Sequence, residues 1–394
     1  MSATAPDTAR LVAAVRAVHA YSRARGWKGS EKHDALNSPL LRTLFGWHRW
    51  TRLLAIQGVM RFPLNLRPLL LVPPAHNPKG VALFAQSMLD MAALSRADAD
   101  RDEARRLLEL LLEIAVPTPC GARAWGYLYP WQDLGFFAPS GTPNAVVSAF
   151  ACEALLDGHE QLGDARWLAP VGDAVRFFLG DLRVLKDEPE ELCLAYMPLP
   201  MTMRVMDVSI LVAAVLARYA RHTGRSELLD PAARLVRYVV RRQTDAGAWW
   251  YTDPPGDSPI GHDNYHTGFI LDALWRWMAA TGDRQYEDAY YRGLRFYAER
   301  LFMPDGAPRW MSDREFPYDV HGAAQGILTF ARHEAEYPGF ADRVAGWALA
   351  HLYDPEGRFY YQRTRRYTKR FTFMRWCNGW MARALAHLAR TRGT

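Results

Sequence analysis

The stretch DNYHTGFILDAL (263–274) begins with a polar cluster and continues as an apolar segment long enough for a buried helix. Two further stretches repeat this arrangement: DVSILVAAVLAR (207–218) starts 56 residues earlier, and DVHGAAQGILTF (319–330) starts 56 residues later. Arg375 continues the series after another 56 residues. A period of this length is typical of stacked helical hairpins. A closed ring of such hairpins would bring the four charged groups around one common cavity.

The same pattern extends over most of the chain. Six segments are expected to form inner helices: 77–95, 142–160, 206–222, 263–280, 319–335 and 372–390. Asn77-Pro78 and Thr142-Pro143 place a capping side chain ahead of a proline at two of their starts. Amphipathic segments such as 227–242 and Gly-centred turns rich in aromatic residues, such as 245–254, separate them. The sequence therefore predicts an all-α fold, an (α/α)6 toroid of helical hairpins with aromatic connecting loops, over residues 76–394.

Residues 1–75 are expected to belong to the same domain and to supply an outer helix and a cover. Within them LLAIQGVMRFPLNLRPLLLVPP (53–74) is apolar with interleaved arginines. Pro63 and Pro68 break any single amphipathic helix there. Packing against the ring is the favoured interpretation, and contact with a membrane surface is the alternative.

The composition limits the class of protein. The 394 residues are 49% hydrophobic and 23% charged, as in a folded globular protein. No run approaches the ~18 apolar residues of a membrane span, and the N-terminus lacks a signal-peptide layout, so a cytoplasmic location is expected. The net charge of +6 favours an acidic partner. The spacing of the four cysteines does not suit a zinc site and the chain has no phosphate-binding loop, so no metal and no cofactor are expected. No nucleic-acid partner is expected either.

Several phrases, in the same order along almost the whole chain, carry a resemblance to a known family. They are DALNSPLL (34–41), FPLNLRPLL (62–70), NPKGVALF (77–84), GYLYPWQD (126–133), TPNAVVSAFACEALLDGHE (142–160), DNYHTGFILDAL, DVHGAAQGILTF and FMRWCNGWM (373–381). The chain resembles the VpsJ-like family of bacterial polysaccharide-biosynthesis proteins. This resemblance implies a six-hairpin toroid of the kind used by glycosidases, polysaccharide lyases and epimerases, in exopolysaccharide or capsule assembly. Pro130 stands where the resemblance implies an acidic residue.

The richest polar cluster is the segment 262–266, which reads His-Asp-Asn-Tyr-His. Five such groups exceed what capping one helix needs, and His and Tyr can transfer protons near neutral pH. Asp319 and His321 repeat the pattern one unit later. The predicted catalytic residues are therefore Asp263, Asp319, Tyr265, His266 and His321. The alternative is that each aspartate only caps its helix.

Two kinds of chemistry fit these residues. In the favoured interpretation, glycoside hydrolysis, Asp263 and Asp319 form the acid/base pair that such a reaction needs. In a lyase or uronate epimerase, Tyr265 and a histidine would remove a proton next to a carboxylate that Arg375 neutralises. A non-enzymatic protein that binds glycans or lipid-linked sugars is a further alternative. An isoprenoid-handling protein is disfavoured because the chain has no D-x-D-D motif.

The predicted substrate-binding residues combine aromatic and polar groups. The basic loop YQRTRRYTKRFTFMRW (361–376) suits carboxylates and phosphates through its arginines and sugar faces through its rings. The set is Arg375, Trp376, Trp131, Gln132, Asn264, Asp207, Trp250 and Tyr361. The expected partner is an acidic glycan or a lipid-linked oligosaccharide, with peripheral contact to a membrane or to the exopolysaccharide machinery.

Overall fold

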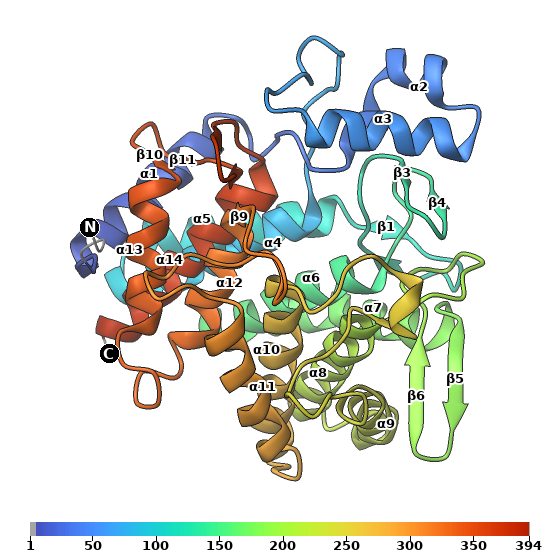
Figure 1. Ribbon diagram of the computed structural model, residues 1–394. Helices are drawn as coiled ribbons and strands as arrows, with labels where there is room; N and C mark the ends of the chain where they lie inside the picture. The colour runs from blue at the N-terminus through green and yellow to red at the C-terminus, as the bar shows by residue number, and fades with distance from the viewer. Residues whose placement is uncertain (1–4, 394) are drawn as a thin grey trace.

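The computed structural model describes residues 5–393, and most of them are helical (Figure 1). The helices are α1 (Thr8–Arg23), α2 (Pro39–Phe45), α3 (Arg49–Arg61), α4 (Pro78–Ser95), α5 (Asp98–Glu113), α6 (Ala145–Leu162), α7 (Leu168–Gly180), α8 (Met206–Thr223), α9 (Leu229–Val240), α10 (Asn264–Thr281), α11 (Glu287–Arg300), α12 (Val320–Phe330), α13 (Phe340–His351) and α14 (Trp380–Gly393). A π-helical turn, Met374–Gly379, leads into α14.

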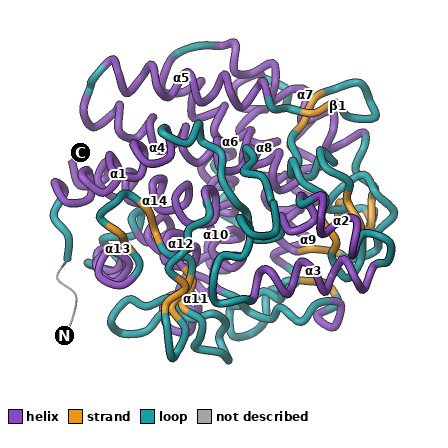
Figure 2. The backbone as a smooth tube through the Cα atoms, turned by 90° about the horizontal axis from the view of Figure 1, so that it is seen from above, coloured by secondary structure: helices purple, strands orange, loops and turns teal. Residues whose placement is uncertain are grey.

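Six inner helices form a closed ring. Helices α4, α6, α8, α10, α12 and α14 each pack against the next, and α14 packs back against α4. They are apolar on nearly all sides; α8, for example, is buried from Met206 to Ala220. The view in Figure 2, turned by 90°, shows the outer helices at the periphery of this ring. The predicted all-α toroid is confirmed.

The outer helices complete the hairpins. Helices α5, α7, α9, α11 and α13 each pack against the inner helix that precedes them in the chain. The sixth pair joins the two ends of the chain, because α1 packs against α14. Leu11, Val15 and Val18 of α1 are fully buried in this contact with the main core.

The starts of α4 and α12 follow the capping chemistry of the sequence, whereas those of α6, α8 and α10 do not. Asn77 accepts a hydrogen bond from the Gly80 amide at 3.3 Å, as expected for α4. For α6 the expected cap, Thr142, is wrong: its hydroxyl donates to the Pro139 carbonyl, and Asn144 caps the helix instead. The β/extended conformation of Asn144 allows this, and α6 therefore begins three residues later than expected.

The connecting loops of the all-α fold contain short strands. These are β1 (Val116–Pro117), β2 (Arg123–Ala124), β3 (Trp131–Gln132), β4 (Phe137–Ala138), β5 (Val184–Glu188), β6 (Glu191–Leu194), β7 (Arg204–Val205), β8 (Thr252–Asp253), β9 (Tyr318–Asp319), β10 (Tyr353–Asp354), β11 (Arg358–Phe359), β12 (Gln362–Arg363) and β13 (Thr368–Lys369). They pair in small antiparallel sheets. Strand β12 pairs with both β9 and β13 and so ties the basic loop 361–376 to the start of α12.

Helices α2 and α3 and the loop after them form a cover, residues 39–74, that stands at the top of the molecule in Figure 1. Leu41, Ile56 and Val59 form a small separate core there. The expectation that segment 53–74 packs against the ring holds only in part, because Leu64 and Leu69 are exposed. No helix within residues 5–393 combines the length and the hydropathy needed to cross a membrane.

Candidate active site

A cavity of about 630 Å³ lies at the N-terminal ends of the inner helices. The second residue of each of the first five inner helices lines it: Lys79 of α4, Val146 of α6, Asp207 of α8, Tyr265 of α10 and His321 of α12. The π-helical turn ahead of α14 adds Arg375 and Trp376, and α3 of the cover closes one side. The ring therefore delivers polar groups from distant parts of the chain to one place.

His266 lines this cavity and is held in place by Asp263. Its Nδ1 lies 2.9 and 3.0 Å from the two carboxylate oxygens of Asp263. Asp263 is the N-cap residue of α10, yet its carboxylate makes no cap bond and does not line the cavity. The ring of His266 also packs on Tyr251 and Tyr265. This bonding orients the imidazole and leaves Nε2 as the nitrogen available to a ligand.

Asp319 has a structural environment. Its Oδ1 accepts hydrogen bonds from the His321 amide (2.9 Å) and the Trp376 indole (2.8 Å), and its Oδ2 accepts one from Gln362 (2.7 Å). Burial raises the pKa of Asp319, and Lys32 and these hydrogen bonds oppose that effect. Asp319 caps α12 and does not line the cavity. The structure therefore does not bring Asp263 and Asp319 together as a carboxylate pair on the cavity wall.

Asp207 is the carboxylate that reaches the cavity from the inner helices. It lies inside the first turn of α8, and its Oδ1 has no hydrogen-bond partner among the described residues. Burial raises the pKa of Asp207, while the charges of His266 and Lys79 act in the opposite direction. A carboxyl group in such surroundings can serve as a proton donor.

Lys79 also lines the central cavity, and sequence reasoning missed it. Its Nζ lies 3.7 Å from the centre of the Phe150 ring and 4.4 Å from that of Phe269. Burial, aided by the charge of Arg375, lowers the pKa of Lys79 well below its ordinary value. The aromatic faces stabilise the ammonium form by cation–π contact.

His321 contributes a neutral imidazole. Its ring stacks on Tyr265 at 4.5 Å and packs against Trp380 at 4.3 Å and Trp376 at 4.6 Å. Neither ring nitrogen has a hydrogen-bond partner within residues 5–393. Burial lowers the pKa of His321 well below the usual value, and Lys79 adds to the effect. The ring is therefore uncharged at neutral pH.

Arg375 lines the cavity but is already paired. Its Nε donates to the carboxylate of Glu31 at 3.0 Å, and its backbone amide donates to the same group at 3.1 Å. Both side chains are almost fully buried. Burial raises the pKa of Glu31, and the charge of Arg375 opposes this. Glu31 lies 344 residues before Arg375, so sequence reasoning had no signal for the pair.

A second cavity of about 420 Å³ adjoins the first and shares Lys32, Met60, Arg61 and Trp310 with it. Lys369 and the predicted binding residue Tyr361 also line it, and no carboxylate does. Burial lowers the pKa of Lys32 to about 8, Asp319 acts to raise it, and its Nζ lies 4.1 Å from the Trp376 ring centre. Three cationic side chains without a carboxylate suit an anionic group.

The other predicted binding residues differ in position. Trp131 lines the central cavity and stacks on His33. Gln132 holds the β3–β4 turn by donating to the Phe136 carbonyl. Asn264 is buried and donates to the Leu301 carbonyl. Trp250 is partly exposed, lies in a separate surface pocket and packs on His262. Gln132, Asn264 and Trp250 therefore lie outside the central cavity.

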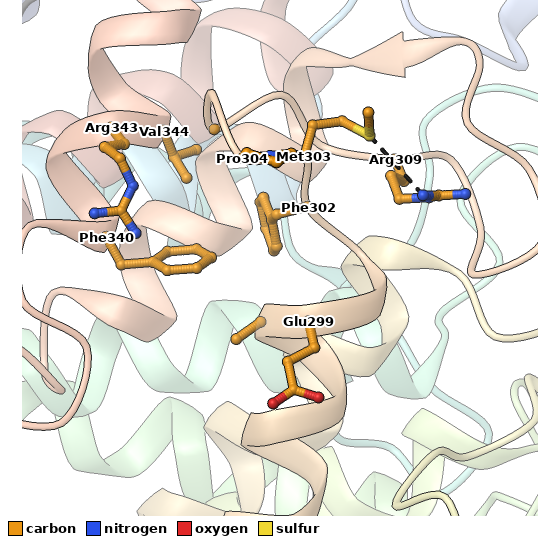
Figure 3. Close-up of a pocket in the computed structure, with 10 residues that line it drawn as sticks. Glu299, Phe302, Met303, Pro304, Arg309, Phe340, Arg343 and Val344 are labelled. Atoms are coloured by element: carbon orange, nitrogen blue, oxygen red, sulfur yellow. Dashed lines mark hydrogen bonds between the residues drawn. The ribbon is translucent and has the colours of Figure 1, made fainter. Parts of the chain in front are cut away.

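A further cavity of about 360 Å³ lies on the outside of the ring, between α11 and α13. Figure 3 shows Phe302 and Phe340 at its centre, with Arg309, Arg343 and Glu299 spread around them. It contains none of the predicted site residues. In the described part of the chain no group of three or more His, Cys, Asp or Glu side chains is arranged to hold a metal ion.

A scan against protein-family models gives no match, and neither does a search of curated proteins. Solved structures do match. A sugar epimerase from a ruminal bacterium aligns over 81% of this chain and 88% of its own, with 14% identity and a TM-score of 0.63. A GH76 α-mannanase of Bacteroides thetaiotaomicron aligns over 80% of this chain and 86% of its own, with 15% identity and a TM-score of 0.59. A polysaccharide lyase aligns over 98% of this chain and 97% of its own, with 12% identity and a TM-score of 0.57.

The likeness is one of fold. At identities of 12 to 15% it shows the α/α toroid and leaves the chemistry to be argued from the side chains of this chain.

Proposed function

We propose that this protein is a carbohydrate-processing enzyme that transfers protons on a sugar held in the central cavity, as in epimerisation or isomerisation. The observation that carries the proposal is His266, which Asp263 orients through Nδ1 so that Nε2 is left for the substrate. Asp207 on the neighbouring inner helix supplies an unpartnered carboxyl group in the same cavity. The fold shared with a sugar epimerase supports this reading.

The reaction needs no net oxidation. Nε2 of His266 takes a proton from the carbon next to the sugar carbonyl, and the electron pair moves onto the carbonyl oxygen to form an enediol. Burial raises the pKa of Asp207, and in its protonated form this carboxyl group donates a proton to that oxygen. The enediol then turns about the neighbouring carbon–carbon bond, so that its other face meets His266. Return of the proton from Nε2 to the same carbon, with return of the oxygen's proton to Asp207, gives the epimer. Return of the proton to the former carbonyl carbon, with loss of the adjacent hydroxyl proton to the Asp207 carboxylate, gives the isomer.

The adjoining cavity supports an anionic substrate. Lys32, Arg61 and Lys369 line it together, and Trp310 and Tyr361 offer flat faces beside them. A carboxylate or phosphate on the sugar would meet these cations while the reacting carbon lies near His266. An acidic glycan or a lipid-linked precursor in exopolysaccharide assembly, as the VpsJ-like resemblance implies, would have such a group.

Glycoside hydrolysis is the second candidate. The buried Asp207 with its raised pKa has the property of a general acid, and Asp133 and Asp257 also line the cavity and could activate water. The fold shared with an α-mannanase supports this alternative. It ranks second because Asp263 and Asp319, the expected carboxylate pair, bond to His266 and Trp376 and do not line the cavity.

Incubation in D2O tests the proposal. Neutral sugars, uronic acids, sugar phosphates and oligosaccharides are each mixed with the protein and read by NMR and mass spectrometry. Deuterium uptake at carbon without cleavage supports proton transfer, and it should disappear in His266→Asn. Cleavage with gain of water supports hydrolysis, and cleavage with a new double bond supports a lyase. Binding to the wild type without any conversion would overturn the enzymatic proposal.

A further inference from the structure

The cover carries an unusual share of the exposed apolar surface. Among the described residues eighteen large hydrophobic side chains are exposed, and nine of them lie between residues 40 and 71: Leu40, Leu44, Trp47, Trp50, Leu54, Phe62, Leu64, Leu69 and Leu71. The most exposed include Trp47 and Leu69, with 73% and 79% of their surface accessible to solvent. So many exposed apolar side chains within one short segment indicate a contact with something apolar.

The cavity explains only two of these nine. Trp50 and Leu54 lie one helical turn apart on α3 and line the central cavity, so they belong to its mouth. The other seven line neither the central nor the adjoining cavity. They come from α2, from the turn before α3 and from the loop after it, the part that stands clear of the ring in Figure 1.

The charge of the cover is one-sided. From residue 35 to residue 89 the chain contains no aspartate or glutamate. Arg42, Arg49 and Arg61 are exposed, and none of the three makes an ion pair with a described residue. Interleaved tryptophan, leucine and arginine suit the boundary between lipid headgroups and acyl chains, where the rings and stems are apolar and the guanidinium reaches phosphate.

We propose that the cover docks this protein on the surface of an anionic lipid bilayer. Trp47, Leu64 and Leu69 enter the headgroup region, and Arg42 and Arg49 contact lipid phosphates. The one-sided charge argues for this occupant, because a second copy would meet the same arginines and be repelled. The contact is peripheral, since no described helix is able to cross the membrane.

Docking has a consequence for the cavity. Helix α3 lies between the docking surface and the central cavity and contributes Trp50, Leu54 and Arg61 to the mouth. In the docked protein the mouth of the cavity therefore lies beside the lipid headgroups, where a sugar attached to a lipid would be found. The docking proposal does not depend on the chemistry in the cavity, and its test requires no sugar.

Vesicle co-sedimentation of the full chain tests the proposal. Vesicles of phosphatidylcholine alone are compared with vesicles of phosphatidylcholine mixed with the anionic lipid phosphatidylglycerol, whose negative surface potential attracts basic side chains. The test variants are Trp47→Ser/Leu64→Ser/Leu69→Ser and Arg42→Glu. The matched controls are Leu179→Ser/Leu229→Ser, which are exposed on outer helices, and Arg10→Glu on α1.

The wild type and both controls should bind the anionic vesicles, and added salt should weaken this binding. Each test variant should bind at least about tenfold more weakly, with an unchanged melting temperature. Failure of the wild type to bind, or equal binding by the triple variant, would overturn the proposal. So would a concentration-dependent dimer that the triple variant abolishes, because the surface would then be a contact between copies.

Discussion

The same position of the sequence repeat is occupied by Asp207, Asp263 and Asp319, but their carboxylates have different roles in the structure. Asp263 and Asp319 precede their helices, and their carboxylates bond to His266 and to Trp376. Asp207 is the second residue of α8, so its side chain reaches the cavity. A shift of two residues in where the helix starts thus decides whether a carboxylate supports the site or lines it.

Asp263 can be tested as a positioning residue. Asp263→Asn keeps an acceptor for Nδ1 of His266 but removes the negative charge that stabilises a protonated ring. We expect kcat to fall by about 100-fold or more with little change in KM. Asp319→Asn is the control, because it should loosen Trp376 and raise KM while kcat changes less. Equal kcat values for wild type and Asp263→Asn would contradict the role of the pair.

Lys32 predicts a pH dependence. Burial lowers its pKa to about 8, so its charge is present below pH 8 and is lost as the pH rises through 8. For an anionic sugar, kcat/KM should therefore fall by about tenfold between pH 7 and 9.5. Lys32→Arg keeps its charge over this range and should abolish the fall. An identical alkaline limb in that variant would exclude Lys32 as its cause.

Lys79 is expected to limit stability. Its pKa is lowered in the folded state, so between that lowered pKa and about 10.5 the unfolded chain binds more protons, and stability rises with pH. Lys79→Met should raise the free energy of unfolding at pH 7 by about 1–2 kcal/mol, reduce this pH dependence and lower activity. Urea denaturation checks this, with the exposed Lys28→Met as control. A less stable variant would contradict it.

The lysines at the two cavities show that the sequence contained a signal for the site that the prediction did not use. The chain has only five lysines, and Lys32, Lys79 and Lys369 lie at the two cavities. In a chain that otherwise uses arginine for its positive charges, a lysine at a helix start was a usable signal. The repeat phase predicted Asp207, Tyr265 and His321 near the cavity, but no spacing rule distinguishes a capping carboxylate from one that lines a wall.

At the scale of elements, the segment between α1 and α2 and the turn before α14 are held together by Glu31 and Arg375. Sequence periodicity located the helices of the ring because their apolar faces repeat. It could not pair these two side chains, because the contact depends on ring closure. Arg375 was accordingly predicted to be free for a substrate carboxylate, and the structure places Glu31 against it.

The pair predicts a large effect on stability. Glu31→Gln leaves the buried guanidinium of Arg375 without its counter-charge, and we expect a loss of about 3–5 kcal/mol in the free energy of unfolding. The double variant Glu31→Met/Arg375→Met should recover most of it, because no buried charge remains. Thermal and urea unfolding measure both. A double variant as unstable as Glu31→Gln would contradict this account.

At the scale of the molecule, α1 and α14 form the sixth hairpin of the ring. Removal of residues 5–23 would uncover the face of α14 that Leu11, Val15 and Val18 bury. We expect the shortened chain to be insoluble or to lack a cooperative thermal transition. The substitution Arg10→Ala, at an exposed position of the same helix, should have little effect and serves as the control. A soluble, cooperatively folding chain without α1 would contradict it.

The same hairpin has a consequence for how the protein is made. Synthesis proceeds from the N-terminus, so α1 leaves the ribosome before the ring helices that follow it, and α14, the helix it packs against, is the last helix of the ring to be made. Until α14 has been made, Leu11, Val15 and Val18 of α1 remain uncovered, at a time when the other five pairs can already assemble. A circular permutant that joins α14 to α1 and opens a loop between two other hairpins would place the two helices of every hairpin next to each other in the chain. Each helix could then pack against its partner soon after it is made.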